Sequence, residues 1–384
     1  MKRLLVLNTG SSSLKWSVLE RAGERSLAAG TVAWDSLDPR RRAEQIAEAL
    51  RAALPAAESR NGAGNEGGGA DGAAHRVVHG GAAFRGAVRI DAEVRERLAR
   101  LVEIDPLHTP AALAGIDAVS AAFPALPQFA AFDTSFHATL PEAAARYALP
   151  WEWSERWGLR RYGFHGLSVA YASRRARELL GGAPARLVVC HLGSGCSASA
   201  VAGGRSLDTS MGFTPLEGVM MASRSGSVDP GLLLHLLARC GLGVEELAGG
   251  LNERAGLLGV SGISADLREV LAAAGAGSAR AATAYAMFTH SVLRTTGAMI
   301  AVLGGLDALV FTGGIGEHSA RLRADVAARL GFAGLELDPR ANEQASGDVE
   351  VSNRRSTVRV LTITAREDLA VLAEVAKLLD ESGV

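Results

Sequence analysis

The fold of this chain is indicated by a stretch that occurs twice. Residues 5–13 read LVLNTGSSS, and residues 188–196 read VVCHLGSGC. Each copy is an apolar run followed by a turn rich in Gly and Ser, after which a second strand is expected. After the first turn, Leu14, Trp16 and Val18 alternate with Lys15 and Ser17, which is the period of a strand with one buried face. We therefore expect duplicated domains that each begin with strand, turn and strand.

Turns of this composition can bind phosphate. Gly and Ser offer closely spaced backbone N–H groups and hydroxyls, which surround phosphate oxygens without carrying a net charge. A plain hairpin turn has the same composition, so one copy alone leaves both interpretations open. Two copies, one near the start of each domain, favour two turns that approach one phosphate chain from opposite sides.

A third glycine turn follows the apolar strand expected at residues 308–311 and reads TGGIGE at residues 312–317. A helix rich in Ala and Arg is expected from Ser319 to Leu330. Strand, glycine turn and helix N-terminus follow one another in nucleotide sites. The sequence contains no Gly-x4-Gly-Lys-Ser/Thr, and this turn does not complete G-x-G-x-x-G, so the P-loop and Rossmann interpretations lose their main support.

The composition excludes several classes of protein. The 40 basic and 41 acidic residues give a net charge of −1, so no global field favours nucleic acid or a membrane surface as a partner. No apolar run is long enough for a membrane span, and the apolar start is too short for a signal peptide. The three cysteines form no C-x-x-C pair, which is typical of reduced thiols. We expect a cytoplasmic protein of two domains, because 384 residues exceed one ordinary core.

Two amphipathic helices are expected early, at residues 41–54 and 91–102, and Asp91 is expected to cap the second. Between them, residues 55–74 include NGAGNEGGG at residues 61–69. Such a composition cannot bury enough apolar surface to become ordered. We predict a flexible surface insertion over residues 55–74.

Arg76 and Asp133 are the first candidates for catalysis. Arg76 lies in HRVVHGG at residues 75–81, which is typical of a strand that ends at a glycine pair. An arginine buried in a strand needs an anionic partner, which is either a ligand or a structural carboxylate. Asp133 directly follows the apolar strand expected at residues 129–132, so it is well placed for a metal or a reacting group. A helix or turn cap is the alternative for Asp133.

His165 and Arg224 are the second pair of candidates. His165 stands in RYGFHG at residues 161–166, where flanking glycines favour a backbone that a ligand approaches closely. A lone histidine is usually structural, but this context is unusual. Arg224 belongs to residues 208–226, a stretch with few charges and no helix or strand pattern. Long irregular segments of this kind are more often functional than structural.

A zinc enzyme and a Ser-His-Asp hydrolase are both disfavoured. His75 and His79 fall in an expected strand and turn rather than on a helix, and His-Glu-x-x-His is absent. The Gly-x-Ser-x-Gly motif of hydrolases is absent as well.

These motifs together resemble those of the acetate kinase family, within the duplicated actin-like and sugar-kinase-like ATPases. The resemblance runs from Leu4 to about Leu372 and is carried by the blocks at residues 8–15, 75–81, 161–166, 208–218 with 224–226, and 311–319. It implies an α/β fold of two actin-like (ribonuclease H-like) domains, with mixed sheets and an interdomain nucleotide cleft. The domains are expected at residues 1–134, completed by 365–384, and at residues 135–364, which would hold the nucleotide site.

The resemblance implies a reversible phosphoryl transfer between ATP and acetate, giving acetyl phosphate and ADP by direct in-line attack. It also implies dependence on Mg²⁺, for which Mn²⁺ can substitute, and a homodimer. A kinase that prefers propionate or butyrate is a close alternative. A non-catalytic nucleotide-binding regulator of the same fold is another, and a sugar kinase would need a polar pocket and an aspartate base.

The resemblance assigns roles to individual residues. It implies catalytic roles for Arg76, Asp133, His165 and Arg224, and metal binding by Asn8 and Glu367. With Arg76 holding the carboxylate, it implies a small apolar pocket for the substrate methyl group formed by Val78, Leu107, Phe164 and Pro215. It implies ATP contacts by Ser11, Ser13, Lys15, His191, Leu192, Gly193, Ser194, Gly195, Asp266, Leu267, Arg268, Gly314, Ile315, Gly316, Glu317 and His318.

These roles fit the chemistry of a carboxylate acceptor. Such an acceptor is already ionised at neutral pH, since carboxyl groups titrate near pH 4. Asp133 therefore need not remove a proton, and we expect it to orient magnesium-bound water and the reacting groups. The main barrier is the repulsion between the carboxylate and the γ-phosphate, which Arg76, Arg224, His165 and a magnesium ion would neutralise.

Several positions depart from the commonest family pattern. The departures are Ser194 for asparagine, Leu167 and Val169 for threonine and histidine, Ser227 for aspartate, and TARED at residues 364–368 in place of a Pro-Thr-Asn-Glu-Glu run, which puts Arg366 next to Glu367. No charged catalyst is lost. The departures suggest the hypothesis of a branch with a different phosphoryl donor.

Overall fold

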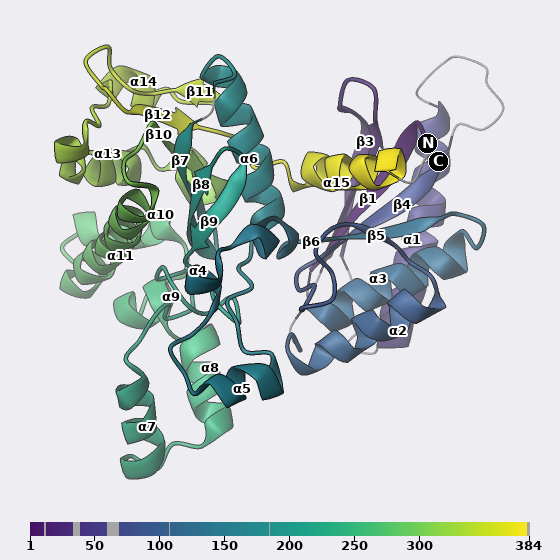
Figure 1. Ribbon diagram of the computed structural model, residues 1–384, viewed down its shortest axis with the longest axis horizontal. Helices are drawn as coiled ribbons and strands as arrows, with labels where there is room; N and C mark the ends of the chain where they lie inside the picture. Colours follow the sequence, from purple (N-terminus) through teal and green to yellow (C-terminus); the bar gives the residue numbers. More distant parts are fainter. Residues whose placement is uncertain (11–12, 34–38, 60–68, 107, 184, 382–384) are drawn as a thin grey trace. The chain divides into compact units, whose positions relative to one another are not determined.

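The computed structural model describes residues 1–10, 13–33, 39–59, 69–106, 108–183 and 185–381 (Figure 1). The chain forms two compact units. Unit 1 consists of Met1–Phe136 and Arg366–Val384, and unit 2 consists of His137–Ala365. The divisions therefore fall at residues 136/137 and 365/366, two residues and one residue after the positions predicted from the sequence, 134/135 and 364/365. In the described residues, each unit contains one six-stranded sheet.

The sheet of unit 1 has the strand order β3-β2-β1-β4-β6-β5. Neighbours β1, β4 and β6 are parallel, and the remaining pairs are antiparallel. The strands are β1 (Arg3–Thr9), β2 (Ser13–Glu20), β3 (Arg25–Ala33), β4 (Gly72–Val77), β5 (Val88–Arg89) and β6 (Gln128–Phe132).

Helices cover both faces of this sheet (Figure 1). Helices α1 (Pro39–Ser59) and α3 (Thr109–Ala122) pack against β1 through a core that includes Leu5, Leu7 and Ile46. Helix α15 (Glu367–Glu381) packs on the other face and contacts β1, β4 and β6. Alternate residues of β1 are thus buried against different helices, as expected for a strand covered on both sides.

Two predictions for unit 1, a helix at residues 91–102 and a flexible insertion at residues 55–74, can be compared with the structure. The helix expected at 91–102 is α2 (Ala92–Arg100), and Asp91 Oδ1 accepts the Val94 N–H at 2.8 Å, so the predicted cap is confirmed. A 3₁₀ turn, η1 (Leu101–Glu103), follows it. The predicted insertion was too long, since α1 continues to Ser59 and β4 begins at Gly72. Residues 60–68 of that prediction lie outside the described residues.

The sheet of unit 2 has the strand order β11-β12-β10-β7-β8-β9. Read from β9 to β11, this sheet has the same strand connectivity as the sheet of unit 1 read from β3 to β5. Each pair of neighbouring strands is also parallel or antiparallel as in unit 1. The expected duplication is therefore confirmed by the topology. The strands are β7 (Arg186–Leu192), β8 (Cys196–Ala202), β9 (Arg205–Thr209), β10 (Ala308–Thr312), β11 (Val349–Glu350) and β12 (Arg359–Thr362).

The helices of unit 2 also lie on both faces of its sheet (Figure 1). Helix α11 (Ala279–Leu303) packs on β7 and β8, and α6 (Gly166–Leu179) packs on β7 and β10 from the other side. None of the described helices is long and apolar enough to span a bilayer. The other helical segments are η2 (Ser135–Thr139, which begins in unit 1), α4 (Glu142–Ala145), α5 (Trp151–Trp157), α7 (Pro230–Arg239), α8 (Val244–Glu253), α9 (Gly256–Ser261), α10 (Leu267–Gly275), α12 (Gly313–His318), α13 (Ala320–Arg329), η3 (Gly331–Ala333) and α14 (Pro339–Glu343).

The glycine turn expected after β10 is itself helical, because α12 begins at Gly313 directly after the strand. Gly313 has φ +78°, and a Cβ there would lie 2.8 Å from the Leu192 carbonyl oxygen. Only glycine fits this approach of the turn to the end of β7. The helix expected from Ser319 is α13, and the Ser319 hydroxyl accepts the Leu322 N–H at its start.

Candidate functional site

Unit 1 gathers polar side chains where its parallel strands end. Arg76 lies on β4, and Asp133 follows β6 directly. Arg76 Nε lies 2.9 Å from Asp133 Oδ1, and Nη2 lies 2.6 Å from Oδ2, so the pair is bidentate. The Asp133 side chain is 2% exposed and that of Arg76 is 16% exposed. The sequence left open whether the anionic partner of Arg76 is a ligand or a carboxylate of the protein, and the structure shows a carboxylate of the protein, Asp133.

Two more residues complete this cluster. Arg76 Nη1 lies 3.2 Å from Asn8 Oδ1 and 2.8 Å from Glu367 Oε2. The Asn8 amide also donates to Glu367 Oε2 at 3.1 Å. Asn8 comes from β1 and Glu367 is the first residue of α15, so the cluster joins the chain's start to its end. Lys15 lies opposite Asn8 in the β1–β2 ladder, which puts both side chains on the same face.

The charges in this cluster depend on one another. Burial by itself lowers the pKa of Arg76, but the Asp133 and Glu367 carboxylates outweigh this effect and raise the pKa above its ordinary value. Burial raises the pKa of Glu367, and Asp133 adds to the rise, while Arg76 and Lys15 oppose it. Arg76 therefore stays protonated and is the cation that two carboxylates share.

The donor set of this cluster suits a hard cation such as Mg²⁺. Mg²⁺ is usually bound by one or two carboxylates together with waters and substrate phosphates. Asn8 Oδ1 and Glu367 Oε2 are oxygen ligands of this kind, but Arg76 already binds both. In the described residues, no group of three or more His, Cys, Asp or Glu side chains is suited to a metal. Asn8 and Glu367 thus fit an ion held through water rather than in an all-protein cage.

Unit 2 contains two histidine rings in contact, tilted by 34° to one another. The ring centroids of His165 and His191 lie 4.2 Å apart. His191 is near the end of β7, and His165 directly precedes α6 with φ 59°, a left-handed conformation that is rare for a residue other than glycine. Such strain persists where the surroundings over-determine it, and it is common at functional sites.

Arg224 lies next to this histidine pair. A Cβ on Gly195 would lie 3.2 Å from His165 Nε2 and 3.6 Å from Arg224 Nη1, so both side chains approach the Gly193–Gly195 turn. Arg224 Nη1 also donates to the Pro215 carbonyl oxygen at 3.1 Å. The turn predicted to bind phosphate is thus flanked by two groups that can donate to an anion.

The loop that presents Arg224 is held by a partly buried polar network. Arg161 Nη2 binds Glu217 Oε1 at 2.8 Å, and the Tyr147 hydroxyl donates to Glu217 Oε2. Arg161 Nη1 also donates to the carbonyls of Ser210 and Met211. This network fixes the first part of a segment that has no helix or strand over residues 210–229.

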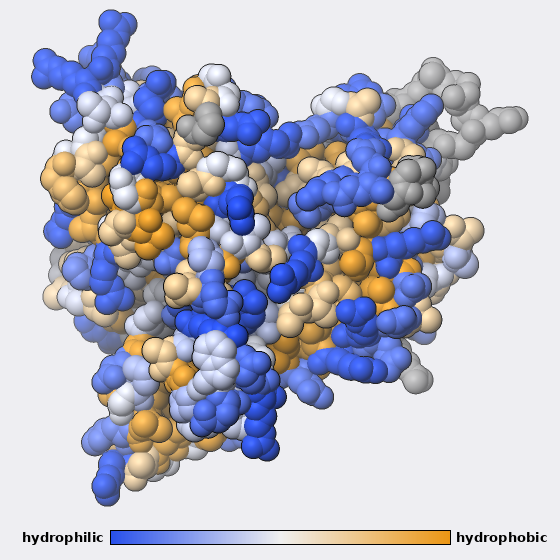
Figure 2. Space-filling model, in the orientation of Figure 1, coloured by the Kyte–Doolittle hydropathy of each residue, from blue (hydrophilic) through white to orange (hydrophobic). Residues whose placement is uncertain are grey.

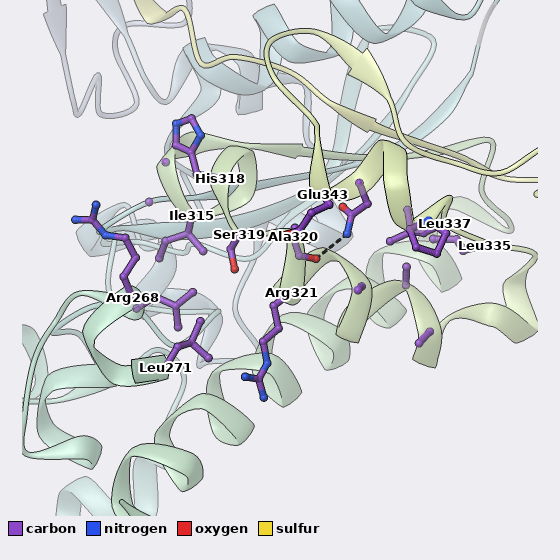
Figure 3. A pocket seen from close by; sticks show the side chains of 18 of the residues that line it. Arg268, Leu271, Ile315, His318, Ser319, Ala320, Arg321, Leu335, Leu337 and Glu343 are labelled. Atoms are coloured by element: carbon purple, nitrogen blue, oxygen red, sulfur yellow. Dashed lines mark hydrogen bonds between the residues drawn. The ribbon is translucent and has the colours of Figure 1, made fainter. Parts of the chain in front are cut away.

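A cavity of about 1410 Å³ opens beside the same turn in unit 2 (Figure 3). It exceeds the ordinary range of ligand pockets, roughly 300–1,000 Å³. Apolar side chains such as Leu271, Ile315 and Leu335 line it, with Arg268, His318 and Arg321 among its polar groups. Eight residues predicted to contact ATP are in its lining: Gly193, Ser194, Asp266, Leu267, Arg268, Gly314, Ile315 and His318.

Other predicted ATP contacts lie outside the lining of this cavity. The Glu317 carboxylate accepts the Ala365 N–H at 3.0 Å, and the Gly316 carbonyl accepts from Arg323. Ser13 and Lys15 belong to unit 1. The remaining three are in or next to the Gly193–Gly195 turn, which is predicted to bind phosphate: His191, Leu192 and Gly195. Ser11 is outside the described residues.

The predicted methyl pocket is only partly described. Val78 lies in unit 1 and is half-buried, whereas Phe164 and Pro215 lie in unit 2, where Phe164 is 1% exposed. Leu107 is outside the described residues. The pocket remains a prediction.

Sequence reasoning missed Arg323, which is 1% exposed on α13. Its Nη1 donates to the carbonyls of Gly316 and Glu317, and its Nε and Nη2 donate to Asn342. Arg323 therefore holds the end of α12 against α14, beside the cavity that Asn342 lines. Since an arginine in an Ala/Arg-rich helix indicates an exposed face, no local signal distinguished it.

The departures from the family pattern have simple structural counterparts. Leu167 and Val169 are buried apolar residues of α6, and the Ser227 hydroxyl accepts the Gly218 N–H. Ser194 is exposed at the cavity. Arg366 binds Asp368 with Nε 2.9 Å from Oδ1, so much of its charge is compensated away from Glu367.

Known proteins resemble this chain over most of its length. A model of the Acetokinase family matches residues 3–373. An acetate kinase of Nostoc punctiforme is 50% identical over 299 residues, which cover 77% of this chain and 74% of that protein. The crystal structure of Porphyromonas gingivalis acetate kinase superposes with a TM-score of 0.87 at 35% identity, covering 99% of this chain and 100% of that one.

A propionate kinase structure is similar to the same degree. The enzyme from Francisella tularensis superposes with a TM-score of 0.87 at 34% identity, covering 97% of this chain and 99% of that one. Residues 3–373, which the family model matches, include every cluster described above. The chain belongs to the Acetokinase family.

Proposed function

We propose that this chain transfers a phosphoryl group reversibly between ATP and acetate, giving acetyl phosphate and ADP. Membership of the Acetokinase family supports the reaction class. The observation that carries the proposal is the approach of His165 Nε2 and Arg224 Nη1 to the Gly193–Gly195 turn, of which Gly193 and Ser194 line the large cavity. Groups that donate to a developing negative charge are what a transfer between two anions requires.

The cavity in unit 2 is the proposed site of ATP. Its apolar walls at Leu271, Ile315 and Leu335 suit a nucleoside, and its volume is ample for one (Figure 3). The phosphates would then extend to the Gly193–Gly195 turn, where backbone N–H groups can donate to phosphate oxygens without carrying a net charge.

The cluster in unit 1 is proposed to bind the acceptor carboxylate and the magnesium ion. Asp133 holds two donor nitrogens of Arg76, so it orients the guanidinium and accepts no proton from a substrate that is already ionised. Asn8 and Glu367 would hold Mg²⁺ through water, with Lys15 contributing positive charge on the same face. When bound, the ion neutralises charge on the phosphates.

Acetate is the first choice of acceptor, and propionate is the second because a propionate kinase structure superposes equally well. One methylene in an apolar pocket is worth about 1–3 kcal/mol, or roughly 10–200-fold in kcat/KM. Measuring kcat/KM for acetate, propionate and butyrate with ATP decides between them. A maximum at propionate or butyrate would overturn the choice of acetate.

A non-catalytic regulator would bind nucleotide without turnover. The joint presence of Arg76, Asp133, His165 and Arg224 in polar clusters argues against it. Isothermal titration with ATP, combined with detection of the acyl phosphate as its hydroxamate, separates the two functions. Binding without acyl phosphate would favour the regulator.

We also propose that the enzyme is a cytoplasmic homodimer. Leu232, Leu234 and Val244 on α7 and α8 are 47%, 67% and 67% exposed, and neither helix has a buried residue. Figure 2 shows hydrophobic side chains over this part of unit 2. The three free cysteines support the proposed cytoplasmic location, where thiols stay reduced. Light scattering should give twice the chain mass, and Leu234→Glu should reduce it to one chain. A monomeric parent protein would refute the dimer.

A further inference from the structure

Each of the two neighbouring histidines, His165 and His191, is bound at Nδ1 by a buried serine. His165 Nδ1 lies 2.9 Å from Ser197 Oγ, and His191 Nδ1 lies 2.8 Å from Ser168 Oγ. Ser197 on β8 is 0% exposed, and Ser168 on α6 is 1% exposed. The two hydrogen bonds come from different elements but engage the same ring nitrogen of each histidine.

The opposite ring nitrogens face the glycine turn. A Cβ on Gly195 would lie 3.2 Å from His165 Nε2, and a Cβ on Gly193 would lie 3.8 Å from His191 Nε2. With Nδ1 bound by serine, Nε2 is the atom of each ring that lies near the turn where phosphate is proposed to bind. The hydrogen on Nε2 therefore decides whether either ring can donate there.

The serine hydroxyl hydrogens determine which ring nitrogen of each histidine carries the hydrogen. Within the described residues, the only hydrogen-bond partner of Ser197 Oγ is His165 Nδ1, and that of Ser168 Oγ is His191 Nδ1. A buried hydroxyl hydrogen without an acceptor is costly. If Nδ1 carried a hydrogen, the serine could only accept and its own hydrogen would have no partner. Satisfying both serines requires Nδ1 as the acceptor, which leaves the neutral ring with hydrogen on Nε2.

The Arg224 guanidinium favours the same neutral state. A phosphoryl oxygen only accepts hydrogen bonds, so the ring must present N–H at Nε2. The His165 and His191 centroids are 4.2 Å apart, and Arg224 Nη1 approaches the same turn. Further positive charge on the rings would be repelled by this guanidinium and by the second ring. A neutral ring with Nε2–H donates without that repulsion.

We propose that Ser197 and Ser168 are positioning residues that hold His165 and His191 as Nε2–H tautomers, so that both rings donate to phosphoryl oxygens. The inference rests on the proposed phosphoryl transfer, because it assigns the acceptor at the turn. It extends that function to two serines that themselves need not touch a substrate.

The tautomers are measured first, without any need for turnover. Long-range ¹H–¹⁵N correlation spectra of the full chain labelled in histidine distinguish the two tautomers, and His165→Gln and His191→Gln assign the signals. Above pH 7.5 we expect both rings as Nε2–H, and in Ser197→Ala we expect His165 to become a mixture. Hydrogen on Nδ1 of His165 in the parent protein would overturn the proposal. An absence of acyl phosphate would count against the proposed function alone.

Kinetics then test the effect on catalysis, with Ser199 as the matched control. Ser199 lies two residues further on β8, is 0% exposed, and binds Thr209 rather than a histidine. We expect Ser197→Ala to lower kcat about 10–100-fold, the range found when an outer-shell partner is lost. The KM for ATP should stay within about twofold, and Ser199→Ala should retain kcat within about twofold.

A double-mutant cycle separates positioning from general loss of packing. In the His165→Gln background, Ser197→Ala should cause no further loss of kcat, because its effect passes through the ring. Ser197→Cys keeps a weak donor of similar size and should fall between serine and alanine. Equal losses in Ser197→Ala and Ser199→Ala, or additive losses in the double variant, would overturn the role of Ser197.

Discussion

Replacing Arg76 with glutamine removes the cation that Asp133 and Glu367 share. The Asp133 side chain is 2% exposed and that of Glu367 is 20% exposed, so neither carboxylate can be fully hydrated once the guanidinium is gone. Removing one partner of a buried ion pair costs about 3–5 kcal/mol. At about 2–4 °C per kcal/mol, the Tm of the variant should fall by roughly 10 °C at pH 8.

The loss should depend on pH. Burial already raises the pKa of Glu367, while Arg76 lowers it, so the pKa rises further in Arg76→Gln. A carboxyl group whose pKa is higher in the folded than in the unfolded state, about 4.3, binds protons on folding. The folded variant therefore loses stability as the pH rises from the pKa of Glu367 in the unfolded chain to its higher pKa in the folded protein. The deficit in Tm should be smaller at pH 5 than at pH 8.

Thermal melts of the parent, Arg76→Gln and Arg76→Gln/Asp133→Asn at pH 5 to 8 test this reasoning. The double variant removes one of the unpaired carboxylates and should regain part of the stability, although the rate of phosphoryl transfer should stay about 10³-fold low. A deficit in Tm that is equal at every pH and unchanged in the double variant would refute the shared-cation account.

Three further predictions concern the site. Gly195→Ala should lower kcat at least about 10-fold with little change in Tm, because its Cβ would lie 3.2 Å from His165 Nε2. Steady-state rates and a thermal melt test this prediction, and an unchanged kcat would contradict it. Glu367→Gln should raise the half-saturating Mg²⁺ concentration about 10-fold or more, measured by Mg²⁺ titration after EDTA treatment, and an unchanged titration would remove Glu367 from the metal site. Initial rates with ATP, GTP and pyrophosphate test the donor hypothesis raised by Ser194, since a clear preference for ATP would remove it.

Local sequence patterns predicted most of what positions the site. The repeated strand, Gly/Ser turn and strand became β1–β2 and β7–β8, since apolar runs and turn residues act over a few positions. The same holds for β10 and for Asp91 as a helix cap. The first and last segments of the chain were assigned to one unit only through the family resemblance, because no local pattern joins Asn8 to Glu367.

The features that were missed depend on contacts between distant residues. The partner of Arg76 stayed open because Asp133 is 57 positions away, and only the parallel pairing of β4 with β6 brings them together. Arg323 was missed because its acceptors on α12 and α14 exist only after these helices pack. The helical form of residues 313–318 was missed because a glycine-rich segment favours turns unless tertiary contacts override the propensity.

The central claim is that clustered cationic groups let two anions exchange a phosphoryl group, and one measurement tests it most directly. Purified protein is incubated with acetate, ATP and Mg²⁺, and acetyl phosphate is trapped as its hydroxamate, in parallel with Arg224→Ala. We predict acetyl phosphate from the parent protein and a rate about 10³-fold lower from Arg224→Ala. No acetyl phosphate from a parent protein that binds ATP, or equal rates from both proteins, would contradict the claim.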